Sequence, residues 1–261
     1  MRILFFGDVV GKVGRDAVHL SLPRLVNKYN VDFVIVNGEN ATHGKGLIEK
    51  HYKDFLEDGA DCVTLGNHWH SKKQIDNYID EADALVRPLN ILNYPHGMGS
   101  VTFDLDGLPI RVTNVLCQSF MKEEVENPIE SLNKLLLDNP EPCIHFIDLH
   151  GESTSEKQIF AYQFSGLVTA VVGTHTHVQT NDARILDEGT AYMSDVGMCG
   201  DPDGVIGFEK ESVINKMVYG NSDSFKINEE AKMMINACII DVDEDTYLAT
   251  NIMTINQMVE R

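Results

Sequence analysis

Two histidines, two residues apart, follow an apolar run in the stretch V-V-G-T-H-T-H-V. The run, residues 168–172, has the length and composition of a buried strand in a mixed or parallel sheet. His175 and His177 come directly after it, and in extended backbone the side chains at i and i+2 point to the same side. Ligands of open α/β folds gather at the carboxyl ends of strands. The sequence therefore predicts two imidazoles that emerge together at a binding edge; the alternative is an ordinary loop with two polar histidines.

Four other predicted strand ends carry side chains that can bind metals. The strands are expected over residues 3–7, 33–36, 62–65 and 143–147, and the polar residues beyond them are Asp8, Glu39, Asn40, Asn67, His68 and His150. Each type has a structural alternative, because aspartate often caps a helix, asparagine is common in turns and a lone histidine is often a hydrogen-bonded structural residue. The recurrence of such residues at five separate strand ends favours one shared site. His70, which follows the bulky Trp69, is interpreted as structural.

The chemistry of this set is that of a metal centre. Carboxylate oxygens mixed with imidazoles suit a borderline divalent ion such as Mn²⁺, Fe²⁺ or Zn²⁺. No cysteine is adjacent to these positions, which argues against a thiolate-rich structural zinc site. Seven ligands from these eight residues are too many for one ion with open positions, but they suit two ions that share a bridging carboxylate. Paired ions about 3.5–4 Å apart activate water and clamp both oxygens of an in-line phosphoryl displacement.

Two glycine-containing loops do not match known phosphate-binding motifs. Gly11 and Gly14 are expected to form a tight loop, but their spacing is not that of a dinucleotide fingerprint. The G-K-G of residues 44–46 lacks the spacing and the hydroxyl residue of a P-loop. Lys45 is therefore only a candidate for substrate contact.

The elements that must position these residues alternate between strands and helices. Helices are expected after Gly14, over residues 47–58 and 128–138, and after a cap at Ser155. Strands are expected over residues 85–88, over 101–115 with a hairpin turn at 104–109, and in a final hairpin over 232–251. The glycine-rich segment 195–204 is interpreted as a cluster of turns rather than the wall of a pocket. Without a linker or an internal repeat, residues 1–261 are expected to form a single α/β domain.

Composition excludes several classes of function. The formal net charge is −19, which argues against an extended nucleic-acid surface because phosphate-backbone affinity comes from Lys and Arg. No apolar run reaches the roughly 18 residues of a membrane helix, and the first residues lack the flank and core of a signal peptide. Five scattered cysteines suit a reducing compartment, so a cytoplasmic protein is expected. The acidic runs 123–126 and 241–245 are interpreted as solvated faces or turns.

The motifs resemble one known superfamily. The order D…G-E-N…G-N-H…H…G-T-H-T-H is similar to that of the calcineurin-like metallophosphoesterases. Three positions depart from the usual pattern: Val10 stands where a histidine ligand is expected, Glu39 replaces the bridging aspartate, and Trp69 replaces the acid after G-N-H. These departures are the pattern of the bacterial YmdB-like phosphodiesterases. The resemblance extends over nearly the whole chain through M-R-I-L-F-F-G-D-V-V-G, V-N-G-E-N-A-x-H-G-K-G, H-x-E-x-T-S-E-K and D-V-G-M-x-G.

The resemblance implies a fold, an activity and a set of ligands. The fold would be a four-layer α-β-β-α sandwich with mixed sheets. One ion would be held by Asp8, Glu39, Asn40 and His177, and the other by Glu39, Asn67, His150 and His175. Asn40 would take the place of the histidine missing at Val10, and His68 would be the general acid. The ions would be iron in the first place, with manganese, zinc or magnesium as alternatives.

The implied reaction is hydrolysis of small cyclic nucleotide phosphodiesters, notably 2′,3′-cyclic nucleotides. The alternative is a metal-containing regulatory or sensor protein linked to RNA turnover, with a protein partner and incidental catalysis. A phosphomonoesterase or a small nuclease would use the same ligands, because ester specificity depends on pocket walls. A symmetric homo-oligomer is the default expectation.

Overall fold

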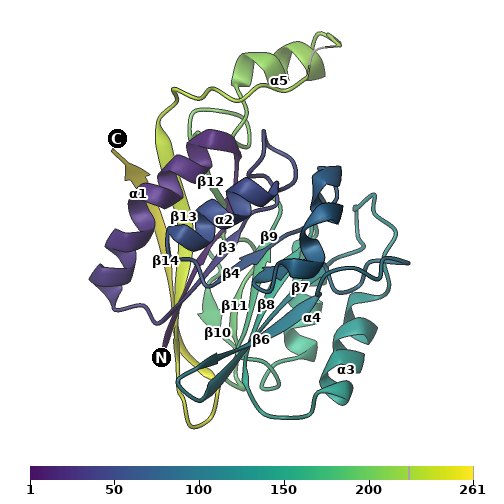
Figure 1. Ribbon diagram of the computed structural model, residues 1–261, viewed down its shortest axis with the longest axis vertical. Coiled ribbons are helices and arrows are strands. Elements are labelled where there is room, and N and C mark those ends of the chain that lie inside the picture. Colours follow the sequence, from purple (N-terminus) through teal and green to yellow (C-terminus); the bar gives the residue numbers. More distant parts are fainter. Residues whose placement is uncertain (223, 261) are drawn as a thin grey trace.

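Two six-stranded mixed sheets form the centre of the computed structural model, which describes residues 1–222 and 224–260 (Figure 1). In spatial order the first sheet contains β14 (Ala249–Val259), β13 (Met233–Val242), β1 (Arg2–Phe6), β3 (Phe33–Asn37), β4 (Cys62–Thr64) and β5 (Leu85–Val86). The second contains β10 (Arg184–Ile185), β11 (Ala191–Met193), β9 (Ala170–Thr174), β8 (Ile144–His150), β7 (Leu108–Leu116) and β6 (Ser100–Leu105). Strands β1, β3, β4 and β5 are parallel, as are β7, β8, β9 and β11.

Helices cover the outer faces of both sheets. The first sheet carries α1 (Gly11–Tyr29) and α2 (Glu49–Glu57), and the second carries α3 (Pro128–Asp138) and α4 (Thr154–Gln163). Between the sheets lies an apolar layer in which the rings of Phe5 and Phe146 meet edge to face, with centroids 4.9 Å apart. The order of layers is thus α-β-β-α, which confirms the expected fold class. The helix α5 (Lys210–Met217) lies apart from these layers at one end of the molecule (Figure 1).

The central strands are apolar on both faces because each lies between two layers. In β1, Ile3 and Phe5 belong to the core between the sheets, while Leu4 and Phe6 pack under the helices. Backbone pairing with β3, from Ile3 opposite Phe33 to Phe6 opposite Val36, places the strand in the sheet. Asp8 follows its carboxyl end.

Two predicted hairpins are present with different limits. β6 and β7 are joined at Asp106 and Gly107, both with positive φ (52° and 91°), the conformation that two-residue hairpin turns require. The last hairpin continues to Val259, beyond the predicted end at residue 251. Polar residues on the outer strand β14 obscured that extension in the sequence.

Three local expectations are corrected. α4 is capped by Ser153, whose Oγ accepts the N–H of Glu156, and not by Ser155. The segment from Gly11 to Gly14 is the first turn of α1 rather than a loop. The segment 195–204 is more than turns, because it contains β12 (Met198–Cys199), which pairs in parallel with β2 (Asp8–Val9).

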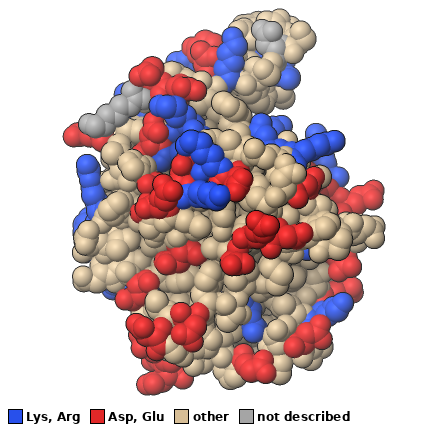
Figure 2. All heavy atoms as spheres, in the orientation of Figure 1, with Lys and Arg blue, Asp and Glu red and all other residues tan. Residues whose placement is uncertain are grey.

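Charged side chains of both signs are mixed on the surface. On the face shown in Figure 2, Lys and Arg alternate with Asp and Glu in the upper half, and acidic groups predominate below. No helix among the described residues is long and apolar enough to span a membrane.

Candidate metal centre

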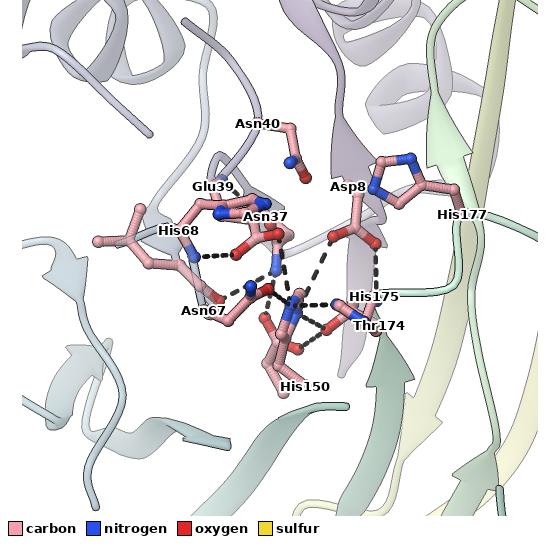
Figure 3. A network of polar contacts seen from close by, with 12 residues as sticks. Asp8, Asn37, Glu39, Asn40, Asn67, His68, His150, Thr174, His175 and His177 are labelled. Atoms are coloured by element: carbon pink, nitrogen blue, oxygen red, sulfur yellow. Dashed lines mark hydrogen bonds and ion pairs between the residues drawn. The ribbon is translucent and has the colours of Figure 1, made fainter. Parts of the chain in front are cut away.

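The predicted site residues come together at one edge of the molecule. The carboxyl ends of β1, β3 and β4 in one sheet face those of β8 and β9 in the other. Figure 3 shows Asp8 and His177 on one side, His68 and Asn67 on the other, and Glu39 between them. Asn40, His150 and His175 complete the group. The structure thus gathers all eight residues that the sequence singled out.

Three side chains converge on one ring nitrogen. The Nε2 atom of His150 lies 2.9 Å from Asn67 Oδ1, 3.1 Å from His175 Nδ1 and 3.3 Å from Glu39 Oε1. A ring nitrogen carries at most one proton, so it cannot donate to all three neighbours at once. Ligand atoms of Glu39, His150 and His175 lie within 4.8 Å of one another. Such convergence of lone pairs suits a cation.

Two further oxygens are buried without a partner. Asp8 Oδ1 and Asn40 Oδ1 form no hydrogen bond, although buried polar atoms are normally paired. The other atoms of these side chains are engaged: Asp8 Oδ2 accepts the His175 N–H (3.1 Å), and Asn40 Nδ2 donates to the Gly44 carbonyl (3.0 Å). These bonds orient both side chains and leave one oxygen of each without a donor. A bound ion would satisfy both oxygens, so the residues fit the expected metals.

Electrostatics supports the same interpretation. Burial, then the charge of Asp195, raises the pKa of Asp8 to about 7. Burial, then the charge of Asp8, raises the pKa of Glu39 well above its usual value. Burial and the neighbouring His175 lower the pKa of His150. Burial makes it costly to ionise these carboxyl groups in the protein alone, and a bound cation would offset that cost. The lowered pKa keeps the imidazole neutral, which is the form that binds a metal.

Hydrogen bonds on the far side of two imidazoles orient them. Nδ1 of His150 lies 2.9 Å from the Thr174 hydroxyl, and Nδ1 of His177 lies 2.9 Å from the Ile206 carbonyl, which only an N–H can donate to. With Nδ1 protonated, Nε2 of the ring carries a lone pair. Metal-binding histidines commonly show this arrangement, which fixes the tautomer.

A buried ion pair holds the G-T-H-T-H segment. Asp195 Oδ2 accepts from Lys157 Nζ (3.1 Å) and from the Thr176 N–H (2.9 Å). Lys157 also donates to the Thr174 carbonyl (2.8 Å). The segment is not extended, because His175 and His177 have φ of 105° and 66°. Both histidines reach the site, but the predicted reason, alternation along a strand, is wrong.

His68 lies beside the centre rather than within the convergent group. Its backbone N–H donates to Glu39 Oε2 at 3.0 Å. Burial, then the charge of Lys45, lowers the pKa of His68 to about 4. His70 is structural as expected: its ring stacks on Trp69 and its Nε2 lies 2.8 Å from Asp76.

The sequence interpretation missed several residues. Glu123, predicted to lie on a solvated face, accepts from Asn67 Nδ2 at 3.3 Å. Asp148, which accepts from the Thr174 hydroxyl at 2.6 Å, is not among the predicted site residues. Its position two residues before His150 was the available signal, because i and i+2 share a face of a strand. Lys157 and Asp195 offered no such signal, since charged residues are seldom buried.

The sequence matches the family described as YmdB-like protein over residues 4–255. It is 42% identical over 254 residues to a 2′,3′-cyclic-nucleotide 2′-phosphodiesterase from Bacillus subtilis, covering 97% of this chain and 95% of the relative. A crystal structure described as a novel phosphatase from Mycoplasma pneumoniae superposes with a TM-score of 0.92 at 38% identity, over 99% of this chain and 93% of that chain. An NAD nucleotidase from Haemophilus influenzae shares the fold alone, with a TM-score of 0.57 and 14% identity over 99% of this chain and 56% of that one.

Proposed function

The chain belongs to the YmdB-like protein family, and on that basis we propose that it is a phosphoric diester hydrolase with a dinuclear metal centre that acts on 2′,3′-cyclic nucleotides. The substrate class rests on the activity by which the Bacillus subtilis relative is named. The observation that carries the dinuclear centre is the pair of unpartnered buried oxygens beside the Glu39–His150–His175 group. One such group suits one ion, and the two oxygens without a hydrogen-bond donor, on Asp8 and Asn40, lie outside that group.

The residues divide between two ions that share one carboxylate. In this proposal Glu39 belongs to both sets. The first ion would be held by Asp8, Asn40 and His177, and the second by Asn67, His150 and His175. When bound, such a pair supplies Lewis acidity, which activates water and neutralises charge on the phosphoryl oxygens. Iron is proposed, with manganese, zinc or magnesium as alternatives, because the ligand set accepts several ions.

His68 is proposed as the proton donor to the departing ribose oxygen. Its backbone bond to Glu39 holds the residue beside the bridging carboxylate. The negative charge of a bound phosphodiester would favour the protonated imidazole, against the burial and the Lys45 charge that disfavour it in the free protein. Lys45, whose charge is close enough to act on His68, is the candidate for contact with that same anion.

The test is turnover of 2′,3′-cyclic AMP by the protein reconstituted with Fe²⁺ or Mn²⁺. The matched control is Asp8→Ala, which removes one of the two unpartnered oxygens. Hydrolysis by the wild type that is lost in the variant would support the proposal. If the wild type binds two metals and leaves the substrate intact, the substrate class is wrong.

A further inference from the structure

A cavity of about 430 Å³ lies at the end of the second sheet opposite the metal centre. Its walls come from β7 and β8, the end of α3, the segment 166–169 before β9, and the turn 246–248 between β13 and β14. His145 in its wall precedes His150 by five positions on β8, which corresponds to about 16 Å along a strand. The volume lies within the range of about 300–1,000 Å³ typical of small-molecule sites.

The cavity contains an arginine that lacks a counter-ion. Arg111 is 7% exposed, and no carboxylate within the described ranges forms an ion pair with it. Its guanidinium makes two long bonds, from Nε to the Thr102 hydroxyl (3.4 Å) and from Nη1 to the Asn139 carbonyl (3.3 Å). A guanidinium has five N–H donors, so most of its capacity is unused. Burying a cation is costly unless it is paired.

Helix capping explains only part of this arrangement. Asn139 ends α3, and a cation is favourable beside a helix C-terminus. That contact uses one N–H of Arg111. The other Nη donors of Arg111, which lines the cavity, form no hydrogen bond with the described residues and are available to a ligand. The planar fork of a guanidinium matches the two oxygens of a carboxylate.

His145 makes the site polar without adding charge. Its Nε2 lies 2.8 Å from the Thr113 hydroxyl, and its Nδ1 has no partner among the described residues. Burial, then the charge of Arg111, lowers the pKa of His145 to about 3, so the ring is neutral near pH 7. Arg111 is then the cationic side chain among the described residues that line the cavity.

The rest of the lining contains both apolar and polar side chains. Leu137 and Leu167, which are 80% and 64% exposed, both belong to it, and Leu136, Val168 and Leu248 continue the apolar surface. Glu141, the carboxylate among the described lining residues, is exposed and does not pair with Arg111. One cation beside this apolar surface suits a ligand with one negative charge and an apolar body. A phosphate dianion would demand a second cation.

We propose that this cavity is a second ligand site, which binds a small organic carboxylate with an apolar body. The carboxylate bonds Arg111, and the apolar body packs against Leu137 and Leu167. The site is independent of the proposed hydrolysis, because none of its lining residues belongs to the metal centre.

The test is calorimetric titration of the metal-loaded protein with 3-phenylpropionate and with its neutral amide, 3-phenylpropanamide. The acid should bind at least about tenfold more tightly than the amide, because bonds to a charged group are the stronger ones. Arg111→Met should remove this preference. Arg24→Met, the same change at an exposed position on α1, should leave it unchanged.

Leu167→Asp provides a variant outside the core, in case loss of Arg111 impairs folding. A carboxylate at this exposed position should weaken binding of the acid about tenfold by repulsion and barely affect the amide. Equal binding of acid and amide, or no binding of either, would overturn the proposal. Binding of the acid that persists unchanged in Arg111→Met would show that Arg111 does not hold the carboxylate and would also overturn the proposal.

Discussion

The hydroxyl of Thr174 lies 2.9 Å from Nδ1 of His150. It donates its own proton to Asp148 Oδ1 at 2.6 Å, so its lone pair faces the imidazole. Nδ1 of His150 must then carry the ring proton, which leaves Nε2 free for the metal centre. Thr64 and Asn37 also donate to Asp148, so the carboxylate that accepts the Thr174 proton is held in place. Asp148, Thr174 and His150 thus form a short hydrogen-bond relay.

Thr174→Val should weaken metal binding. The variant keeps the shape of the side chain but removes the acceptor of the His150 N–H, and loss of such outer partners typically costs 10–100-fold in metal affinity. Competition with a chelator measures the effect directly. Thr174→Ser keeps the hydroxyl and should bind metal like the wild type. Equal affinity in the Val and Ser variants would show that the relay does not orient His150.

Asn40→Ala should lower the metal content towards one ion per chain. The substitution removes an unpartnered buried oxygen from the proposed first set and leaves Asn67, His150 and His175 in place. Elemental analysis after gel filtration gives the stoichiometry. Asn40→Asp keeps an oxygen there and should retain two ions. A full complement of metal in the Ala variant would contradict the assignment of Asn40.

His68→Ala should slow hydrolysis according to the leaving group. A general acid typically contributes roughly 10²–10⁴-fold, and this applies when the departing oxygen needs a proton. We expect a large loss with 2′,3′-cyclic AMP and a small one with a p-nitrophenyl phosphodiester, whose leaving group departs as an anion. Both rates should be compared at equal metal content. A similar loss with the two substrates would argue that His68 positions Glu39 and donates no proton.

His145→Gln should make stability less sensitive to acid. The pKa of His145 is about 3 in the folded protein, below the unfolded value of about 6.5. The unfolded chain therefore binds the extra proton, and the stability present above about pH 6.5 is lost as pH falls towards 3. Between about pH 7 and pH 5 this loss is about 2 kcal/mol, which the variant should avoid. Urea denaturation in the presence of a chelator measures it without metal release.

His19→Gln is the control of opposite sign. The hydrogen bond to Asp58 raises the pKa of His19, so its contribution to stability is present at low pH and is lost as pH rises through the folded pKa. This variant should be less stable than the wild type at acidic pH. If the free energy of unfolding depends on pH in the same way in the wild type and both variants, neither histidine contributes to the acid sensitivity of the fold.

Strand ends were predictable because burial leaves a clear pattern in the sequence. An apolar run such as 33–36 must be buried as a strand, and the polar residues that follow lie just beyond its end, so Glu39 and Asn40 were placed correctly at that end. The backbone of the G-T-H-T-H segment was not predictable, because its left-handed residues depend on tertiary hydrogen bonds. The cap at Ser153 was missed because Ser155 has the same chemistry two positions later.

Partners that are distant in the sequence escaped prediction. The contact between Asn67 and Glu123 spans 56 positions, and nothing local distinguishes Glu123 from the other acids of its run. The four-layer arrangement likewise came from the resemblance to a family, because periodicity alone does not say which sheet faces which. The role of Thr174 becomes visible only once β8 and β9 are paired, because that pairing places it beside His150.

Lys157→Met should destabilise the fold strongly. Lys157 and Asp195 are both fully buried, and their atoms Nζ and Oδ2 lie 3.1 Å apart. Removing the lysine leaves an uncompensated charge on Asp195, and breaking a buried pair in this way typically costs about 3–5 kcal/mol. Urea denaturation of the metal-free protein measures the loss without a contribution from bound ions. Lys53→Met is the matched control, because the pair of Lys53 with Glu49 is exposed to solvent and should contribute little to stability.

The double variant Lys157→Met/Asp195→Asn separates charge from packing. The amide that replaces the carboxylate of Asp195 has an oxygen that can still accept the Thr176 N–H, and it carries no charge to neutralise. The Gly197 N–H, which Asp195 Oδ1 accepts at 2.9 Å, loses its acceptor in the amide, and the Thr174 carbonyl still lacks its donor. Stability should therefore recover only in part relative to Lys157→Met. If the double variant is no more stable than Lys157→Met alone, relief of the buried charge does not outweigh the loss of that hydrogen bond.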